Sequence, residues 1–312
     1  MGQNTADSRK SLLIWGALAI VYVVWGSTYL AIRIVIETIP PLFSGAMRFT
    51  TAALILGAAV FLLRGRQAFR MGWRELGGAA LVGLLLLNAG NGLVAVAEQH
   101  ISSGLAALLV ASVPLWLVIL RIVARDRPQL LTLAGVLIGF GGVAVLSLTG
   151  GGSASDGTGI TIILLASMSW SVGSFLSARI PMPADPFAAS AIEMAAGGIG
   201  MVLTGTVMGE HLDLGAISGR SWAGLAYLIV MGSLVAFTAY VWLLGNAPIS
   251  LVSTYAYVNP VVAVALGALV LSEPVTSSML AAGLVIVIGV ALVVSTERRK
   301  KATEEEKELA PA

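Results

Sequence analysis

Ten long apolar stretches dominate this sequence, and few structures can accommodate them. Each can cross the ~30 Å hydrocarbon core of a bilayer as a helix that rises ~1.5 Å per residue. A soluble fold is excluded, because charged residues make up only 11% of the chain, against about 25% in soluble domains. The stretches also lack the alternating polarity of membrane β-strands. We therefore expect an all-α membrane protein with ten transmembrane helices, at Ser11–Ile32, Leu42–Leu63, Leu76–Ala97, Ser103–Val123, Leu130–Leu148, Ile160–Ala178, Pro186–Met208, Trp222–Gly245, Ser250–Leu271 and Ser277–Val294.

The order of these stretches predicts two halves of five helices each. A segment rich in Gly and Ser separates the fifth stretch from the sixth, as a flexible linker would. We expect the tail to form a short solvated helix or to stay unstructured, because it is rich in Lys and Glu. The predicted parts are a cytoplasmic N-terminus (1–10), a first repeat (11–149), a linker (150–159), a second repeat (160–295) and a charged cytoplasmic tail (296–312).

The basic residues predict the orientation of the chain. Of its 18 Lys and Arg residues, only Arg33 and Arg220 fall in loops on one side of the membrane, and Arg48 lies within a span. The others lie on the side of the two termini. Because such an excess marks the cytoplasmic side, we expect both termini to be cytoplasmic.

The two halves repeat each other at one constant offset. Chance would not keep one register over a whole half, so a duplication explains the pattern better. Each half has an odd number of helices, so the two copies should insert in opposite orientations. Inverted repeats are the architecture of many secondary transporters. The matching residues, 146 positions apart, are Arg33 and Arg179, Pro40 and Pro186, Pro114 and Pro260, and Pro128 and Pro274.

Several short motifs resemble those of the EamA-type drug/metabolite transporter superfamily, over the chain from about Trp15 to Val294. The resemblance implies ten spans, two inverted EamA repeats, and export or exchange of a small metabolite or drug across a bacterial-type inner membrane. Amino acids or related compounds are among the substrates it suggests. The motifs are Trp25-Gly26-Ser27-Thr28, Arg48-Phe49, Ser103-Gly104-Leu105-Ala106-Ala107 ahead of Pro114-Leu115, Asn259-Pro260-Val261-Val262-Ala263, and Glu273-Pro274.

Two ionisable residues stand out within predicted spans. Arg48 lies in the second span and Glu193 in the seventh. Such residues cost ~2.5–3.5 kcal/mol on insertion scales, so they usually face a partner or a water-filled cavity. Arg48 is a candidate to hold a substrate carboxylate, and Glu193 to carry a proton. The alternative for each is a structural anchor that pairs across helices.

The third span carries a polar stripe. Asn88, Asn91 and Glu98 follow an i, i+3, i+10 spacing, which places them on one face of an α-helix. We interpret this face as part of a cavity lining, with Glu98 at the outer mouth. The alternative is that the asparagines bond to a neighbouring helix.

Further candidates lie beside two prolines. Pro114 in the fourth span and Pro260 in the ninth each remove a backbone donor, which predicts a helix break near mid-membrane. Freed carbonyls and polar neighbours at such a break can bind substrate or cations, although a proline kink can also serve packing alone. The polar neighbours in the ninth span are Ser253, Tyr255, Tyr257 and Asn259.

Aromatic residues complete the predicted binding site. Tyr22, Trp25 and Tyr29 follow an i, i+3, i+7 spacing in the first span, and Trp170 lies in the sixth. Such rings suit a flat apolar or cationic solute, through stacking and cation–π contacts. Ordinary helix packing explains the spacing equally well.

These features together predict a secondary transporter that works by alternating access. A channel-like uniporter is the alternative, and a membrane-embedded enzyme is a weaker one, because no catalytic motif is found. With two His and no Cys we expect no cofactor and no metal site, and the net charge of +2 gives no reason to expect nucleic acid. The expected partners are the lipid bilayer and a small-molecule substrate, with a coupling proton on Glu98 or Glu193 as a hypothesis. The substrate, the direction of transport and the oligomeric state stay open.

Overall fold

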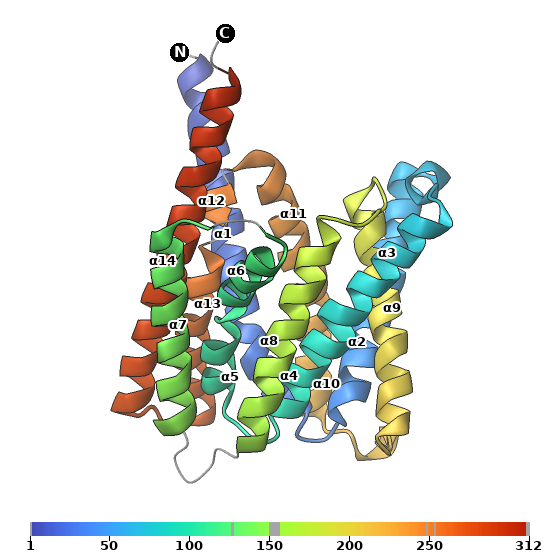
Figure 1. Cartoon of the computed structure of the whole chain (residues 1–312). Coiled ribbons are helices and arrows are strands. Elements are labelled where there is room, and N and C mark those ends of the chain that lie inside the picture. Colours follow the sequence, from blue (N-terminus) through green and yellow to red (C-terminus); the bar gives the residue numbers. More distant parts are fainter. Residues whose placement is uncertain (1, 126–127, 150–156, 248, 253, 310–312) are drawn as a thin grey trace.

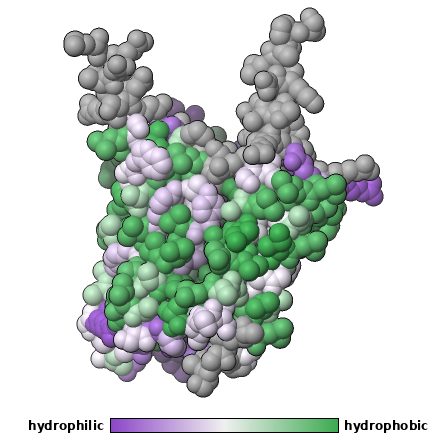
Figure 2. Space-filling model, turned by 90° about the vertical axis from the view of Figure 1, so that its left-hand side faces the viewer, coloured by the Kyte–Doolittle hydropathy of each residue, from purple (hydrophilic) through white to green (hydrophobic). Residues whose placement is uncertain are grey.

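The chain folds into a bundle of helices whose two ends emerge on the same side (Figure 1). The structure is a computed structural model and describes residues 2–125, 128–149, 157–247, 249–252 and 254–309. No strand occurs within these ranges, so the prediction of an all-α protein is confirmed. On the face that Figure 2 shows, apolar residues cover much of the middle of the bundle, and the most hydrophilic residues lie toward its ends.

The first half supplies five apolar segments, of which the third and fourth are interrupted. Its elements are α1 (Gly2–Val35), α2 (Pro41–Arg64), the short 3-10 turn η1 (Arg66–Phe69), α3 (Trp73–Gly83), the π-helical segment η2 (Leu84–Gly92), α4 (Leu93–Ala97), α5 (Ser103–Val110), α6 (Val113–Val123) and α7 (Leu130–Thr149).

The second half follows the same plan. Over both halves together, nine helices of the described ranges are long and apolar enough to cross a membrane. In the second half, α12 and α13 together form a tenth apolar stretch, which is interrupted. The elements are α8 (Gly157–Ser177), α9 (Pro186–Val207), η3 (Leu214–Ala216), α10 (Gly219–Tyr227), the π-helical segment η4 (Leu228–Val235), α11 (Ala236–Asn246), α12 (Ile249–Val252), α13 (Tyr255–Leu271) and α14 (Ser277–Leu309).

Equivalent helices of the two halves run in opposite directions. Arg33, near the end of α1, donates a hydrogen bond to the main-chain carbonyl of Glu98. Gly159, near the start of α8, packs against His100 and Ile101. The last residues of α1 therefore lie at the same end of the bundle as the first residues of α8, the lower end in Figure 1. This is the arrangement expected of inverted repeats.

The helix pair α2–α9 joins the halves along its full length. At the lower end, Glu210 accepts hydrogen bonds from the first free N–H groups of α2, those of Leu42 (3.1 Å) and Phe43 (3.0 Å). At the upper end, Asp185 caps α9 and pairs with Arg64 at 2.5 Å. Between these caps, small and apolar side chains from both helices form one core cluster: Ala46, Phe49, Ala52, Ala53, Leu56, Val60, Ala188, Ala191, Met194 and Met201.

Glycines bring α7 and α14 into close contact. A Cβ atom on Gly135 would lie 3.0 Å from the carbonyl oxygen of Gly289, and one on Gly142 would lie 2.9 Å from the backbone nitrogen of Ile286. Small residues of this kind allow helix backbones to approach in a membrane. The fifth helices of the two halves thus pack antiparallel on each other.

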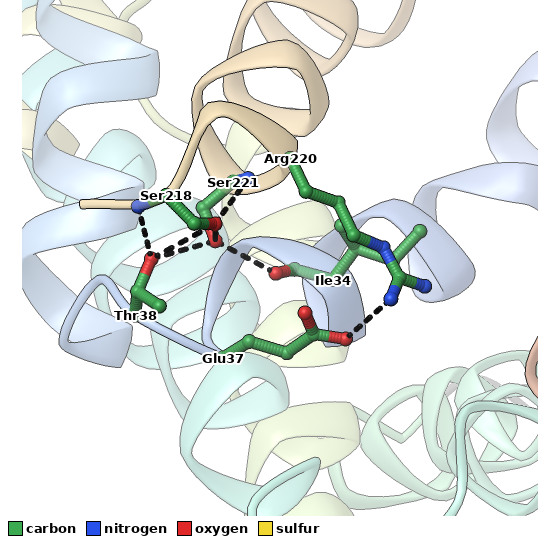
Figure 3. A network of polar contacts seen from close by, with 6 residues as sticks. All are labelled: Ile34, Glu37, Thr38, Ser218, Arg220 and Ser221. Atoms are coloured by element: carbon green, nitrogen blue, oxygen red, sulfur yellow. Dashed lines mark hydrogen bonds and ion pairs between the residues drawn. The ribbon is translucent and has the colours of Figure 1, made fainter.

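A polar network fastens the end of α1 to the start of α10 (Figure 3). The Thr38 hydroxyl accepts from the Ser218 N–H at 3.1 Å and donates to the Ser221 hydroxyl at 2.8 Å. Ser221 in turn donates to the Ile34 carbonyl at 3.0 Å. These bonds give main-chain groups at two helix ends side-chain partners.

The helix breaks differ from those predicted at the two prolines. Pro114 opens α6, directly after a turn at Ala111 and Ser112. Pro260, in contrast, lies inside α13, so the prediction of a break at this residue is wrong in position. Within the described residues the ninth stretch is interrupted ahead of Tyr255. The missing N–H of Pro260 concerns the carbonyl of Ala256, which lies inside α13, so the proline does not account for this interruption.

The predicted boundaries also shift at the linker and the tail. α8 begins at Gly157, so the last three residues of the predicted linker 150–159 are helical, and 150–156 lie outside the described residues. The helix predicted to end at Val294 continues to Leu309 as part of α14. The helical form of the tail is therefore the one observed over the described part.

Candidate functional site

Three aromatic rings from both halves meet in the interior of the bundle. The ring of Trp25 (α1) lies 5.0 Å from that of Tyr240 (α11) and 5.2 Å from that of Tyr255 (α13), between ring centroids. Tyr240 and Tyr255 are 5.8 Å apart and perpendicular. All three side chains are half-buried. Tilted and edge-to-face pairs of this kind each add about 0.5–1.5 kcal/mol beyond area burial. We call these three residues the aromatic cluster.

A buried arginine and the aromatic cluster contact neighbouring residues of η4. The indole N–H of Trp25 donates to the carbonyl of Gly232 at 3.3 Å. The next residue, Ser233, accepts a hydrogen bond of 2.9 Å from Nε of Arg48 (α2). Arg48 is only 6% exposed, so its charge lies inside the protein and away from lipid. Gly232 leaves room for this approach, since a Cβ there would lie 3.1 Å from Nη2 of Arg48.

Hydrogen bonds hold the helices that carry the aromatic cluster. The hydroxyls of Tyr22 (α1) and Thr254, ahead of α13, are bonded to each other. The Asn259 amide nitrogen, turned toward its acceptors, reaches the main-chain carbonyls of Tyr255 at 3.2 Å and Tyr22 at 3.3 Å. Gly26 lets α13 approach α1, because a Cβ there would meet the side chain of Val262. Asn259 therefore joins α13 to α1.

Two other predicted residues lie nearer the lower end of the bundle. Glu98, just past α4, is fully buried, and no described residue bonds to its carboxyl oxygens. Tyr29, one turn of α1 beyond Trp25, interacts electrostatically with Glu98. Glu98 is thus enclosed, and the prediction that it stands at an open mouth is wrong.

The remaining predicted residues lie apart from the aromatic cluster. Asn88 accepts a 3.0 Å hydrogen bond from Thr204 of α9, which fits the interhelical alternative. Trp170 packs on η2, 3.0 Å from where a Cβ of Gly90 would be. The backbone of Glu193 packs on Gly83 in the same way. Asn91 and Tyr257 are half-buried, Tyr257 against the largest core cluster, and Ser253 lies outside the described residues.

The structure also brings in residues that the sequence analysis missed. Tyr240 and Ser233 belong to the eighth apolar stretch and are seven residues apart. That spacing, two helical turns, puts polar side chains on one face of an otherwise apolar span and could have revealed them. Together with Arg48 and the aromatic cluster they offer one fixed positive charge, hydroxyl groups and ring faces. Such a set can hold a small solute with an anionic group and an apolar or cationic part. Among the described residues, no group of His, Cys, Asp and Glu could hold a metal ion.

Comparisons with known proteins agree with this architecture. The model of the EamA-like transporter family matches residues 12–148 and 157–295. An Escherichia coli protein named uncharacterized inner membrane transporter YedA is 41% identical over 261 residues, which cover 83% of each chain. An uncharacterized transporter of Archaeoglobus fulgidus is 23% identical and covers 90% of this chain and 98% of its own. A crystal structure with 22% identity covers 93% of this chain and 98% of its own with a TM-score of 0.61, which supports the fold. The two family matches fall on the two halves of the bundle, and the chain belongs to the EamA-like transporter family.

Proposed function

We propose that this chain is a secondary transporter of the inner membrane that moves a small metabolite or drug by alternating access, with both termini in the cytoplasm. The antiparallel arrangement of equivalent helices supports this proposal, because two similar halves of opposite orientation can exchange their conformations. The relative in Escherichia coli supports the location, since its name describes an inner membrane transporter. The halves 11–149 and 160–295 are the two repeats of this mechanism.

The single observation that supports the proposed site is that Arg48 is buried and has no carboxylate partner within the described residues. Its guanidinium is buried, and its Nε bonds to Ser233. No carboxylate pairs with it among the residues that the structure describes. A buried charge is costly unless it is paired, and the terminal N–H groups of an arginine match a carboxylate in geometry. A substrate carboxylate supplies the missing partner.

The aromatic cluster narrows the substrate class. One of its rings, that of Trp25, donates a hydrogen bond to Gly232, next to the residue of η4 that Arg48 contacts. Ring faces attract cations by about 0.5–2 kcal/mol and stack on flat apolar groups. An amino acid or a related carboxylate with an ammonium or an aromatic part meets both demands, with Arg48 on the carboxylate and the rings on the other end.

Counterflow in reconstituted vesicles tests the function. Vesicles preloaded with one unlabelled compound from a panel of amino acids, other carboxylates, nucleosides and sugars would receive the same compound in labelled form. A carrier gives a transient accumulation of label that saturates with concentration, and the carboxylates should give the largest signal. Label that only equilibrates would favour a channel-like uniporter, and no movement of any compound would contradict the proposal. Chemical conversion of the compound would point to an enzyme instead.

A further inference from the structure

Among the described residues, Glu98 is the charged group with the lowest exposure, and its carboxyl oxygens have no hydrogen-bond partner. Its exposure is 0%, and both carboxyl oxygens lack a hydrogen bond within the described ranges. It directly follows the third spanning segment, Trp73–Ala97. An ionised carboxylate without a partner would be very costly in such a place, so the group neutralises instead. Burial, together with the charge of Glu273 and against that of Arg33, raises the pKa of Glu98 well above its usual range.

Few ionisable groups face Glu98, and they come from two sides. α1 contributes Tyr29 and Arg33, and the loop between α13 and α14 contributes Glu273. His100 follows two residues later in the chain. The packed helices α5 and α8 contain no ionisable side chain, and the buried arginine of α2 bonds to Ser233. Arg33 is therefore the only cation from these elements that acts on the carboxyl group.

The two groups near Glu98 differ in how firmly they are held. Glu273 accepts three bonds at the start of α5, from the N–H and hydroxyl of Ser103 (2.9 and 3.0 Å) and from the N–H of Gly104 (3.2 Å). Glu273 thus caps the N-terminus of α5, and these bonds fix its carboxylate there. Arg33 bonds to the main-chain carbonyl of Glu98 rather than to its carboxyl group. A change of side-chain rotamers could bring the same guanidinium onto the carboxylate.

An open pocket lies beside Arg33 and Glu273. It has a volume of about 600 Å³ at the lower end of the bundle. Arg33 lines it, as do Gln99 and His100 next to Glu98 and the helix cap Glu273. Glu98 itself is not part of the lining, whereas Arg33, which bonds to the main-chain carbonyl of Glu98, is.

We propose that Glu98 is the proton-binding site of this transporter and that Arg33 is the cation with which its carboxylate pairs once the proton has left. In this step the O–H bond of the carboxylic acid breaks, the proton passes to water in the pocket, and the electron pair stays on the carboxylate. Arg33 then leaves the carbonyl for the carboxylate, and the contact between α1 and the end of α4 changes. The coupling to transport rests on the proposed function, whereas the protonation of Glu98 does not.

Infrared titration of the full protein in vesicles tests the protonation directly. The wild type should show the band of a protonated carboxylic acid at neutral pH, and the band should disappear at alkaline pH. The part of the band that disappears only at alkaline pH should be missing in E98Q and present in the matched control E193Q, which removes the glutamate inside the spanning helix α9. R33Q should move the midpoint to higher pH, because the carboxylate loses its cation. R33K should keep the midpoint close to that of the wild type. An unchanged band in E98Q would overturn the proposal.

Transport separates the coupling from the function. With the compound that gives counterflow, E98Q should lose accumulation driven by a pH gradient by about tenfold more than it loses counterflow. E98D retains a titrating carboxyl group and should keep part of the accumulation, which guards against a variant that fails to fold. Accumulation by E98Q at the wild-type level would overturn the coupling. Absence of counterflow in the wild type would overturn the proposed function, while the infrared titration would still decide whether Glu98 holds a proton.

Discussion

The third helix of each half contains a π-helical segment, but the surroundings of the two segments differ. η2 (Leu84–Gly92) is surrounded by packing contacts: Ser169 donates to its Leu85 carbonyl at 2.8 Å, and Asn88 accepts from α9. η4 (Leu228–Val235) faces Arg48 and the aromatic cluster. π-helical segments often occur at functional sites. Both halves thus have a π-helical segment in the third helix, but only η4 contacts Arg48 and the aromatic cluster, which we propose to bind substrate.

Removal of the charge beside η4 should have the largest effect on transport. Arg48→Gln keeps a side chain of similar shape and loses the group that we assign to the substrate carboxylate. A hydrogen bond to a charged group contributes about 1.5–3 kcal/mol, so we expect roughly a 10- to 100-fold loss in counterflow efficiency. The matched change beside η2, Asn88→Ala, should stay within about threefold of the wild type. Equal losses in both variants would contradict the proposed difference between the segments.

Glycine substitutions should separate packing from binding. A Cβ on Gly83, at the start of η2, would collide with the backbone of Glu193, which cannot turn aside. Gly83→Ala should therefore destabilise the fold by about 2 kcal/mol. In Gly232→Ala the atoms nearest to the new methyl would belong to the side chains of Arg48 and Thr28 rather than to the backbone, so the melting temperature should change little while counterflow falls. Thermal unfolding in detergent and counterflow, measured on both variants, check this. The reverse pattern would show that η4 serves packing.

A smaller effect is expected from the indole N–H of the aromatic cluster. Trp25→Phe keeps a ring but removes the 3.3 Å hydrogen bond to Gly232. One neutral hydrogen bond contributes about 1 kcal/mol, which is roughly fivefold in counterflow efficiency. Trp170→Phe, the corresponding change against η2, should alter counterflow by less than about twofold. A larger loss with Trp170 than with Trp25 would place the binding site on the other segment.

The smallest effect concerns the upper end of α2–α9, remote from both segments. Partial burial opposes ionisation of Asp185, but the bonds from Arg64, Ala188 and Phe187 outweigh it and lower the pKa of this carboxyl group. Its contribution to stability is thus present above the unfolded pKa of ~3.9 and is lost as the pH falls through the folded value. Because Arg64 is half-exposed, the loss should be below about 1 kcal/mol. Melting temperatures at neutral pH and near pH ~3, below the unfolded pKa, should differ more for the wild type than for Asp185→Asn. An equal difference would assign the acid sensitivity to other groups.

Much of the fold was predictable, because the lengths of the apolar stretches and the positions of the prolines repeat in both halves. Residues 146 positions apart, such as Pro40 and Pro186, start α2 and α9 on opposite ends of the bundle. The lengths of the apolar stretches gave the helices. The π-helical segments were not predictable, because nothing in the residues of Leu84–Gly92 distinguishes i→i+5 from i→i+4 bonding. Their i→i+5 bonding changes the spacing of side chains. The stripe of Asn88, Asn91 and Glu98 assumed α-helical spacing throughout, and in the structure Asn88 bonds to α9 while Glu98 lies against α1.

The candidate site was predictable only in parts. Trp25, Arg48 and Tyr255 each stood out in their own span, as aromatic or charged groups among apolar neighbours. Their meeting in space depends on how α1, α2 and α13 pack, and periodicity within one helix does not contain that information. A similar limit applies to the spacing of Ser253 and Tyr257, which assumed a continuous helix where the structure has a break before Tyr255.

The doubly capped pair α2–α9 has a consequence for the history of this chain. One member comes from each half, and the caps Glu210 and Asp185 tie the two helices at both ends. A half-length ancestor would have left the small, apolar face of its second helix without a cover. A second copy inserted in the opposite orientation would pack against that face. The ancestral protein would then have worked as an antiparallel homodimer with the same contact between the two second helices. Fusion of two such copies in one chain would fix this pairing, and the bodies that move during transport need not coincide with the two repeats.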